Sequence, residues 1–388
     1  MATTADAVII GGGVMGTSIL YNLALQGLTR VILLEKDVLA SGSTGRSQAI
    51  LRMHYSNEVT TRLAWESLKF FKEFNQFTDI SSGYKQTGYL VIVNNEEELA
   101  LKTNIEMQKK LGVNTDIISP TEVKKLAPMI SMESDEVYAF EPESGYADPY
   151  AVTTGYARKA RELGATIKMR SPVIDIETKE DKINRVITAK ETIETPIVVI
   201  AAGPWSGPIL HKLGVTTPLI SVRHQIIRLK RPYEKIPFHP ILGDIVNSLS
   251  ARPDLSDLTL IGVGEDELGE PETYNRGVDM PIVQETFCKI TKRMPDMCEA
   301  SFIGGWSGLF TVTPDWHPIL DAIKEIEGLY CAIGFSGHGF KLSPMVGQVM
   351  AELITQATSK SIDISMLGLS RFEEGRLLDS RYNLNVLA

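Results

Sequence analysis

Apolar and polar positions near the N-terminus alternate in blocks that predict a strand, a helix and a second strand. The first apolar run, Ala7–Ile10, is short and continuous, which is typical of a strand buried on both faces. Residues 14–27 carry apolar positions at helical spacing, and a second apolar run follows at Val31–Leu34. This order predicts the beginning of a parallel sheet that is covered by helices.

Downstream, helical and strand patterns alternate without an internal repeat. Helices are predicted at about 57–77, 95–111, 120–126, 150–163 and 343–357, and strands at 89–93, 165–169, 172–177 and 183–190. The apolar run that begins at Ile197 indicates another buried parallel strand, and 329–334 is predicted to return to the same sheet. Residues 219–230 and 258–263 are predicted as strands of a second, mostly antiparallel sheet.

The first strand breaks into a Gly-x-Gly-x-x-Gly motif made by Gly11, Gly13 and Gly16. Gly11 permits a tight turn, Gly13 permits close approach to a pyrophosphate, and Gly16 permits close packing of helix on strand. The helix N-terminus offers N–H groups and partial positive charge to phosphates. Glu35 ends the second strand, where its carboxylate can bind a ribose diol and would repel a 2′-phosphate. The pattern predicts a dinucleotide site that disfavours NADP.

Composition and charge restrict the compartment and the partners. The chain has 388 residues, of which 43% are hydrophobic and 22% charged, which is enough for two domains. A net charge of −9 argues against nucleic acid as a partner. Cys288, Cys298 and Cys331 lack metal-ligand spacing, so no metal site is predicted, and they suit a reducing compartment. No targeting segment precedes the first strand and no apolar stretch reaches the roughly 18 residues of a membrane span, so we expect a cytoplasmic protein.

Further motifs accompany the N-terminal site. They are Ser41–Ser47, Val198–Trp205, the Thr313-Pro-Asp315 sequence, and Gly334–Pro344 with its Gly-His-Gly-Phe-Lys core. Together with the glycine motif and Glu35, they resemble the FAD-dependent amine oxidoreductases of the D-amino-acid oxidase superfamily. The nearest members are sarcosine oxidase, pipecolate oxidase, glycine oxidase and dimethylglycine dehydrogenase, and the resemblance covers nearly the whole chain.

The resemblance implies an α/β fold with the flavin ring at the interface of two domains. We expect a Rossmann-type FAD-binding domain, interleaved with a mostly antiparallel β-sheet substrate domain. The FAD-binding domain is predicted to comprise residues 1–80, 145–215 and 325–388. The substrate domain is predicted to comprise residues 81–144 and 216–324.

The cofactor is expected to be FAD, held by the glycine-rich motifs. Gly334, Gly337 and Gly339 let the backbone lie against the flavin ring, and the helix that follows adds a positive dipole end where reduction leaves negative charge. A surface position is the alternative for Arg46. The predicted FAD-binding residues are Gly11, Gly13, Val14, Met15, Gly16, Glu35, Lys36, Ser43, Thr44, Arg46, Ser47, Val173, Ala202, Gly203, Trp205, Gly308, Gly337, His338, Gly339, Phe340 and Lys341.

The resemblance also implies that Arg52 and Lys341 hold the carboxylate of an amino-acid substrate. Arginine offers a bidentate fork for a carboxylate. Arg52 stands in an otherwise apolar run, where an unpaired charge would be costly, and this favours an acidic partner or ligand. The alternative for Lys341 is a solvated lysine at a helix start.

The chain departs from the family pattern at positions that bear on the flavin. The cysteine that binds the flavin covalently in monomeric oxidases corresponds to Gly308, so we expect non-covalent FAD. The Ala147–Tyr150 segment lacks the histidine that links a second flavin in heterotetrameric relatives. The oxygen-activating lysine of the monomeric oxidases falls near Leu258–Leu260, where no lysine occurs. This favours a dehydrogenase or a slow oxidase, with Arg223, Arg252 or His224 as other sources of positive charge.

We expect oxidation of a small secondary or primary amino acid, such as sarcosine, glycine, proline or dimethylglycine, to an imine by hydride transfer to flavin N5. One alternative is a 2-hydroxy-acid oxidoreductase, which generally needs an enzyme base. The other is a flavin-bearing subunit or assembly factor without chemistry of its own. We interpret His338 and His54 as structural or orienting residues. A partner subunit and a homo-oligomer are both left open.

Overall fold

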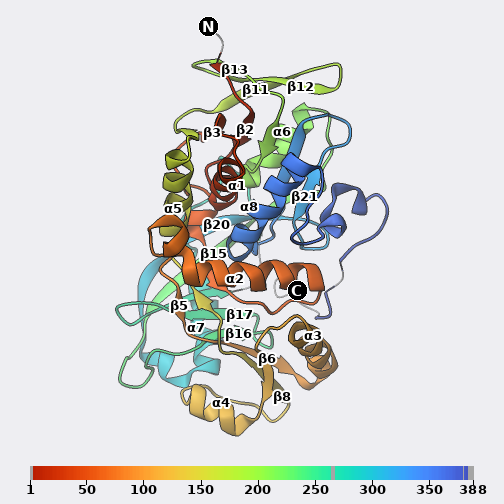
Figure 1. Ribbon diagram of the computed structural model, residues 1–388. Coiled ribbons are helices and arrows are strands. Elements are labelled where there is room, and N and C mark those ends of the chain that lie inside the picture. The colour runs from red at the N-terminus through yellow and green to blue at the C-terminus, as the bar shows by residue number, and fades with distance from the viewer. Residues whose placement is uncertain (1–2, 264–266, 379, 383–388) are drawn as a thin grey trace.

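The computed structural model of the protein describes residues 3–263, 267–378 and 380–382. A six-stranded sheet forms the upper half of the molecule, where α1, α5 and α8 also lie, and a nine-stranded sheet forms the lower half (Figure 1). The main helices are α1 (Val14–Leu25), α2 (Glu58–Thr78), α3 (Glu98–Lys110), α4 (Pro120–Leu126), α5 (Pro149–Glu162), α6 (Ser206–Lys212), α7 (Met280–Arg293) and α8 (Gly339–Gln356).

The six-stranded sheet has the order β10-β3-β2-β14-β22-β21. Its strands are β2 (Ala7–Ile10), β3 (Val31–Leu34), β10 (Thr166–Lys168), β14 (Val198–Ile200), β21 (Ile319–Ala322) and β22 (Leu329–Ile333). All neighbours are parallel except β21, which is an antiparallel edge strand. The predicted return of residues 197–200 and 329–333 to the N-terminal sheet is therefore confirmed.

Alternate residues of the central strands face different layers. Ala7 and Ile9 of β2 pack with apolar residues of α1, α2, α5 and α8. Val8 and Ile10 face the other side, where they pack with α6 and a four-stranded sheet. The strands of that sheet are β1 (Thr3–Thr4), β11 (Val173–Lys179), β12 (Lys182–Thr188) and β13 (Thr192–Glu194). Both faces are covered, which explains the continuous apolar runs.

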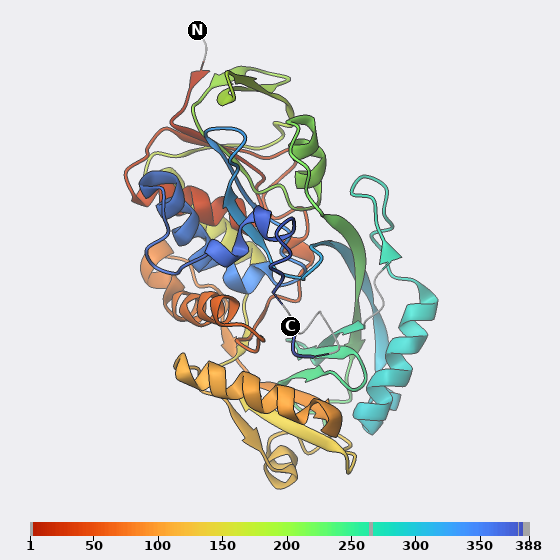
Figure 2. The ribbon, with the colours of Figure 1, turned by 90° about the vertical axis from the view of Figure 1, so that its right-hand side faces the viewer.

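The nine-stranded sheet is mostly antiparallel, as predicted, with one parallel pair between β6 and β16. Its strands are β6 (Tyr89–Asn94), β7 (Asp116–Ile118), β8 (Glu136–Glu141), β15 (Ile220–Lys230), β16 (Ile241–Asp244), β17 (Leu249–Pro253), β18 (Leu258–Val263), β19 (Glu267–Leu268) and β20 (Ser301–Val312). One face packs against α4 and α7, and the other packs against α3. Figure 2 shows α7 on the outer side of this sheet and α3 at the lower end of the molecule. A small sheet of β4 (Ile50–Leu51), β5 (Lys85–Gln86) and β9 (Gly145–Tyr146) completes the fold.

Some elements differ from the sequence-based prediction. The helix predicted from residue 343 begins earlier, at Gly339, and Pro344 lies inside it. Ser343 Oγ donates to the Phe340 carbonyl at 2.8 Å and replaces the N–H that proline lacks. The strand β20 and the helix α7 were not predicted, since glycines at 304, 305 and 308 hide the alternation of β20. The edge strand β21 lies within the range predicted for the substrate domain, and the division by residue range stays a prediction.

Candidate active site

A cavity of about 800 Å³ lies between the two large sheets and takes its walls from both. It brings together nearly all of the residues predicted from the sequence. Those that line it are Gly11, Gly13, Val14, Met15, Glu35, Lys36, Ser43, Thr44, Arg46, Ser47, Arg52, Val173, Ala202, Gly203, Trp205, Gly308, Gly337, His338, Gly339, Phe340 and Lys341. Gly16 does not line the cavity, and its contribution is to packing.

The turn between β2 and α1 requires glycine at two positions. Gly11 has a φ of +115°, and a Cβ there would overlap the carbonyl oxygen of Ala201. A Cβ at Gly16 would overlap the carbonyl oxygen of Gly11, so the helix can approach the turn this closely only because Gly16 lacks a side chain. The first turn of α1 contains no acidic residue, and its N-terminal end faces the cavity. This is the geometry of an anion site.

Glu35 lines the cavity near the N-terminal end of α1 and is only 9% exposed. Its Oε2 accepts a hydrogen bond from Gly12 N at 2.6 Å, and its Oε1 accepts one from Asp37 N at 2.7 Å. An ionised carboxylate has about four acceptor positions, so each oxygen can accept a further hydrogen bond from a ligand diol.

The 41–47 loop is tied to both halves of the molecule. Thr44 Oγ1 accepts from Val14 N at 3.1 Å, and Ser43 Oγ donates to Leu309 O of β20 at 2.7 Å. Arg46 Nη1 donates to the carbonyl of Gly42 at 2.8 Å, so this arginine braces its own loop while it lines the cavity. A Cβ at Gly308 would lie 3.1 Å from Arg46 Cβ, which shows how closely the loop packs on β20.

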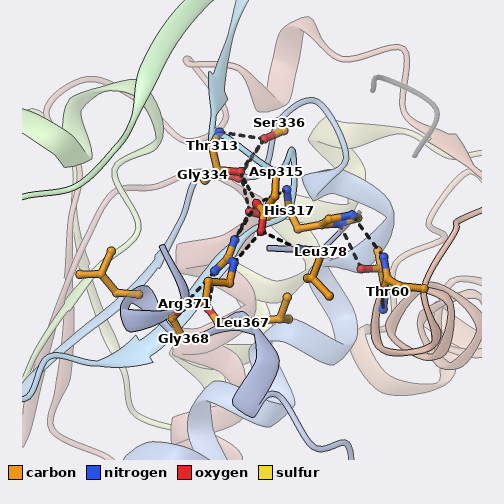
Figure 3. Close-up of polar contacts among 12 residues, drawn as sticks. Thr60, Thr313, Asp315, His317, Gly334, Ser336, Leu367, Gly368, Arg371 and Leu378 are labelled. Atoms are coloured by element: carbon orange, nitrogen blue, oxygen red, sulfur yellow. Dashed lines mark hydrogen bonds and ion pairs between the residues drawn. The ribbon is translucent and has the colours of Figure 1, made fainter. Parts of the chain in front are cut away.

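A buried polar network supports the other end of the cavity from behind (Figure 3). Asp315 accepts two hydrogen bonds from Arg371, to Oδ2 at 2.7 Å and to Oδ1 at 2.9 Å, and Arg371 is fully buried. Thr313 Oγ1 donates to Asp315 Oδ1 at 3.1 Å, and Thr313 N donates to Ser336 Oγ at 3.3 Å. Ser336 lines the cavity, so the Thr313-Pro-Asp315 turn holds the Gly334–His338 loop in place.

His317 extends this network to α2. Its ring nitrogens lie 3.2 Å from Asn57 Nδ2 and 3.3 Å from Thr60 Oγ1, and Figure 3 shows the ring between the Asp315 turn and the helix. Burial lowers the pKa of His317 to about 4, so the ring is neutral near pH 7. It therefore fixes helix and turn through neutral hydrogen bonds.

Arg52 and Lys341 line the cavity from different segments, one directly after β4 and the other in the first turn of α8. Both are buried, with exposed fractions of 4% and 7%. The Arg52 guanidinium lies 4.5 Å from the centre of the Tyr55 ring, and Lys341 Nζ lies 5.9 Å from the same centre. Burial, together with the charge of Arg52, holds the pKa of Lys341 well below its usual range. The alternative of a solvated lysine is therefore wrong.

The two candidate histidines occupy different positions. His338 lines the cavity and packs edge-on against Tyr55 at 5.3 Å between ring centres. His54 is 1% exposed and lies behind Arg52, where its carbonyl accepts a hydrogen bond from the Arg52 guanidinium. Neither Tyr55 nor the buried Glu141, which accepts from Met53 N at 3.0 Å, was predicted. No sequence motif marks either residue, so only the folded chain shows their place in the site.

Residues 258–260, where the resemblance places an oxygen-activating lysine, are not part of the cavity lining. Thr259 is fully buried and lies 3.4 Å from His239, outside the cavity lining, whereas Gly262 of the same strand lines the cavity. Among the other sources of positive charge, His224 lines the cavity and stacks on Phe310. Arg223 and Arg252 lie outside the lining and are paired with acidic residues.

A cluster at the Glu35 end was also missed by sequence reasoning. Glu272 Oε1 accepts hydrogen bonds from Lys36 Nζ at 2.7 Å and Trp205 Nε1 at 2.5 Å. Lys36 Nζ lies 3.9 Å from the centre of the Trp205 ring. All three residues line the cavity, and Glu272 comes from the loop between β19 and α7. Its neighbourhood has no motif that would have marked it.

The residues present fit an FAD molecule. The N-terminus of α1, which faces the cavity, suits a pyrophosphate, Glu35 has acceptor positions for a ribose diol, and the glycine-rich loop before α8 lines the same cavity as Arg52 and Lys341. Within the described ranges, no histidine, cysteine or acidic side chains gather into a group that could hold a metal ion. No helix of the described chain has the length and apolar composition to cross a bilayer.

Comparisons with known proteins agree with this geometry. The chain is 27% identical over 369 residues to the mitochondrial sarcosine dehydrogenase of Homo sapiens, a match that covers 91% of this chain and 40% of that protein. It is 27% identical over 387 residues to the sarcosine oxidase subunit beta of Arthrobacter sp., covering 96% of this chain and 92% of that one. The chain thus spans less than half the length of the mitochondrial relative.

A solved structure is similar over the whole fold. The crystal structure of L-proline dehydrogenase from P. horikoshii superposes with a TM-score of 0.90 at 31% identity, and the match covers 97% of this chain and all of that one. The family described as FAD dependent oxidoreductase matches residues 6–353, which include the glycine motif, Arg52, the Asp315 turn and Lys341. The chain therefore belongs to the family of FAD-dependent oxidoreductases.

Proposed function

We propose that the protein binds FAD non-covalently and oxidises a small secondary or primary amino acid to an imine, which water then hydrolyses. The observation that carries this proposal is the pair of buried basic side chains, Arg52 and Lys341, in the wall of the cavity that also contains the dinucleotide motif. FAD supplies the two-electron acceptor when it is bound. The relatives named for sarcosine and proline support an N-alkylated or cyclic amino acid as substrate.

The two basic side chains, Arg52 and Lys341, define how the substrate carboxylate is oriented. Arg52 can form paired hydrogen bonds with a carboxylate, and Lys341 adds a compact charge from the first turn of α8. Both groups lie against Tyr55, so their side chains are held before the substrate arrives. With the carboxylate fixed beside Arg52 and Lys341, the carbon bonded to the amine would point toward the glycine-rich wall formed by residues 334–339.

Non-covalent binding is supported by the cavity wall. Gly308 stands where a linking cysteine is expected, and in the described chain Cys288 and Cys298 are exposed while Cys331 is buried in β22. None of these cysteines belongs to the cavity lining. The Arthrobacter relative is named as a subunit, so we include association with a second polypeptide in the proposal; a homo-oligomer is its alternative.

Anaerobic titration of the yellow protein tests the proposed reaction. The panel contains sarcosine, L-proline, glycine and dimethylglycine, with lactate as the hydroxy-acid comparison. We expect at least one amino acid to bleach the visible absorbance of the flavin, with no bleaching by lactate. Bleaching by lactate alone would establish the hydroxy-acid alternative. Bleaching by none, in protein that retains its FAD, would support the non-catalytic subunit.

A further inference from the structure

The C-terminal segment (residues 371–378 and 380–382) runs to the region between the upper and lower halves of the molecule (Figure 2). Arg371 anchors it to Asp315, and Leu378 N donates to Asp315 Oδ2 at 3.3 Å. Further on, Arg381 N donates to Ser56 Oγ at 3.2 Å, and Arg381 Nη1 donates to Asn104 Oδ1 of α3 at 2.7 Å. These contacts bring residues 380–382 to the back of the segment that carries Arg52.

Tyr382 makes the contact that matters for Arg52. Its hydroxyl lies 2.6 Å from His54 Nε2, and its ring stacks on the imidazole with 5.7 Å between centres. Tyr382 is 4% exposed and packs in the same apolar cluster as Tyr89 of β6. Burial raises the pKa of its phenol, so the hydroxyl stays protonated over the working pH range.

The His54 ring is held on both sides. Its Nδ1 lies 3.3 Å from Gln108 Nε2 of α3 and 3.6 Å from Glu141 Oε1 of β8. The His54 carbonyl accepts a hydrogen bond from Arg52 Nη1. A chain of contacts therefore runs from the Tyr382 hydroxyl through the His54 ring and backbone to the guanidinium.

We propose that Tyr382 is a positioning residue for Arg52: the C-terminal segment, through the Tyr382–His54 hydrogen bond, sets the orientation in which Arg52 meets the substrate carboxylate. This inference rests on the proposed function, since it assumes that Arg52 binds a carboxylate. Tyr382 lies beyond residue 353, where the match to the family ends.

The test compares Tyr382→Phe with Tyr84→Phe. Both substitutions remove a tyrosine hydrogen bond of 2.6 Å, but Tyr84 bonds the carbonyl of Glu143 outside the cavity lining. Phenylalanine keeps the ring in the apolar cluster, and the thermal midpoint of each variant reports whether it folds. Binding is followed through the flavin spectrum with sarcosine and L-proline, and with their carboxamides, which lack the charge.

We expect Tyr382→Phe to raise the apparent Kd for the two carboxylates about 3- to 10-fold, which is the loss of one neutral hydrogen bond. The carboxamides and FAD retention should change little, and Tyr84→Phe should match the wild type. In the Arg52→Ala background, Tyr382→Phe should cause no further loss, because the residue that it positions is gone. Equal losses for carboxylates and carboxamides, or additive losses in the double variant, would overturn the proposal.

A second readout does not depend on the ligand. Hydrogen exchange of the amides in residues 50–55 should be faster in Tyr382→Phe than in Tyr84→Phe, since the His54 ring loses one of its contacts. Unchanged exchange together with unchanged Kd values would overturn the positioning role alone. If Arg52→Ala binds both carboxylates normally, the assignment of Arg52 in the proposed function fails instead, even where the exchange result holds.

Discussion

Asp315 binds Arg371 through both carboxylate oxygens, at 2.7 and 2.9 Å, and joins the C-terminal segment to the turn that supports the cavity. Burial alone would raise the pKa of Asp315, but the hydrogen bonds and the charge of Arg371, together with backbone hydrogen bonds from His317 and Leu378, outweigh burial and hold the pKa below its usual value. The pair is inaccessible to water, so removal of one partner leaves a buried charge without compensation.

We predict that Asp315→Asn lowers the free energy of unfolding by on the order of 3 kcal/mol at pH 7, measured by urea denaturation. The ionised carboxylate stabilises the fold above the unfolded-state pKa of about 4, and this contribution is lost as the pH falls through the lower folded-state pKa. The difference between variant and wild type should therefore shrink in acid. Glu66→Gln, which breaks an exposed pair with Lys69, should cost less than about 1 kcal/mol. A difference that stays constant down to acid pH would contradict the role of the ionised pair.

The flavin link has a simple chemical test. Because Gly308 replaces the expected cysteine and lines the cavity, acid precipitation should release the yellow colour into the supernatant as FAD. A pellet that stays yellow after washing would show a covalent bond and point to another attachment residue.

The lowered pKa of Lys341 leads to a prediction about protons. Burial and the charge of Arg52 favour the neutral amine in the free site, and a bound carboxylate favours the ammonium form. Binding of a carboxylate ligand above the lowered pKa should therefore take up a proton, and affinity should fall as the pH rises. Calorimetry in buffers of different ionisation enthalpy measures this uptake. Lys341→Met should abolish the uptake; uptake that persists in this variant would assign the proton to another group.

The electron acceptor is predicted from the charges around the cavity. Reduced flavin reacts with oxygen fastest where a positive charge stabilises superoxide. The strand β18 offers Gly262 rather than a cation at the cavity, the lowered pKa of Lys341 favours its uncharged amine in the free site, and a bound carboxylate offsets the charge of Arg52. We therefore expect slow reoxidation when reduced protein is mixed with air-saturated buffer in a stopped-flow instrument, with faster turnover by a dye. Reoxidation faster than turnover would identify an oxidase and direct attention to His224.

Local patterns were sufficient to predict the parallel sheet and the dinucleotide turn. Runs such as Ala7–Ile10 are buried on both faces, and Gly11 and Gly16 have steric requirements that sequence spacing reveals. The residues that contact and position the site residues were not predictable from local patterns. Glu272, Tyr55 and Tyr382 act through contacts between segments far apart in the chain, and no local periodicity records such contacts.

The start of α8 shows a different reason for error. The start predicted at residue 343 was too late, and Pro344, a residue type that is typical of a first helical turn, lies inside the helix. The folded chain accommodates this proline because the Ser343 hydroxyl satisfies the Phe340 carbonyl. As a result, Lys341 lies within the helix and is buried beside Arg52, where it can contribute to a binding site.

The central claim is that Arg52 and Lys341 hold a substrate carboxylate beside FAD. It is tested most directly by kcat/KM for sarcosine or L-proline, whichever reduces the flavin, and for its carboxamide, in the wild type, Arg52→Ala and Lys341→Met. A charge-assisted hydrogen bond contributes about 1.5–3 kcal/mol, so each variant should lose about 10- to 100-fold with the carboxylate and little with the carboxamide, while FAD stays bound. Normal kcat/KM for the carboxylate in both variants would contradict the account.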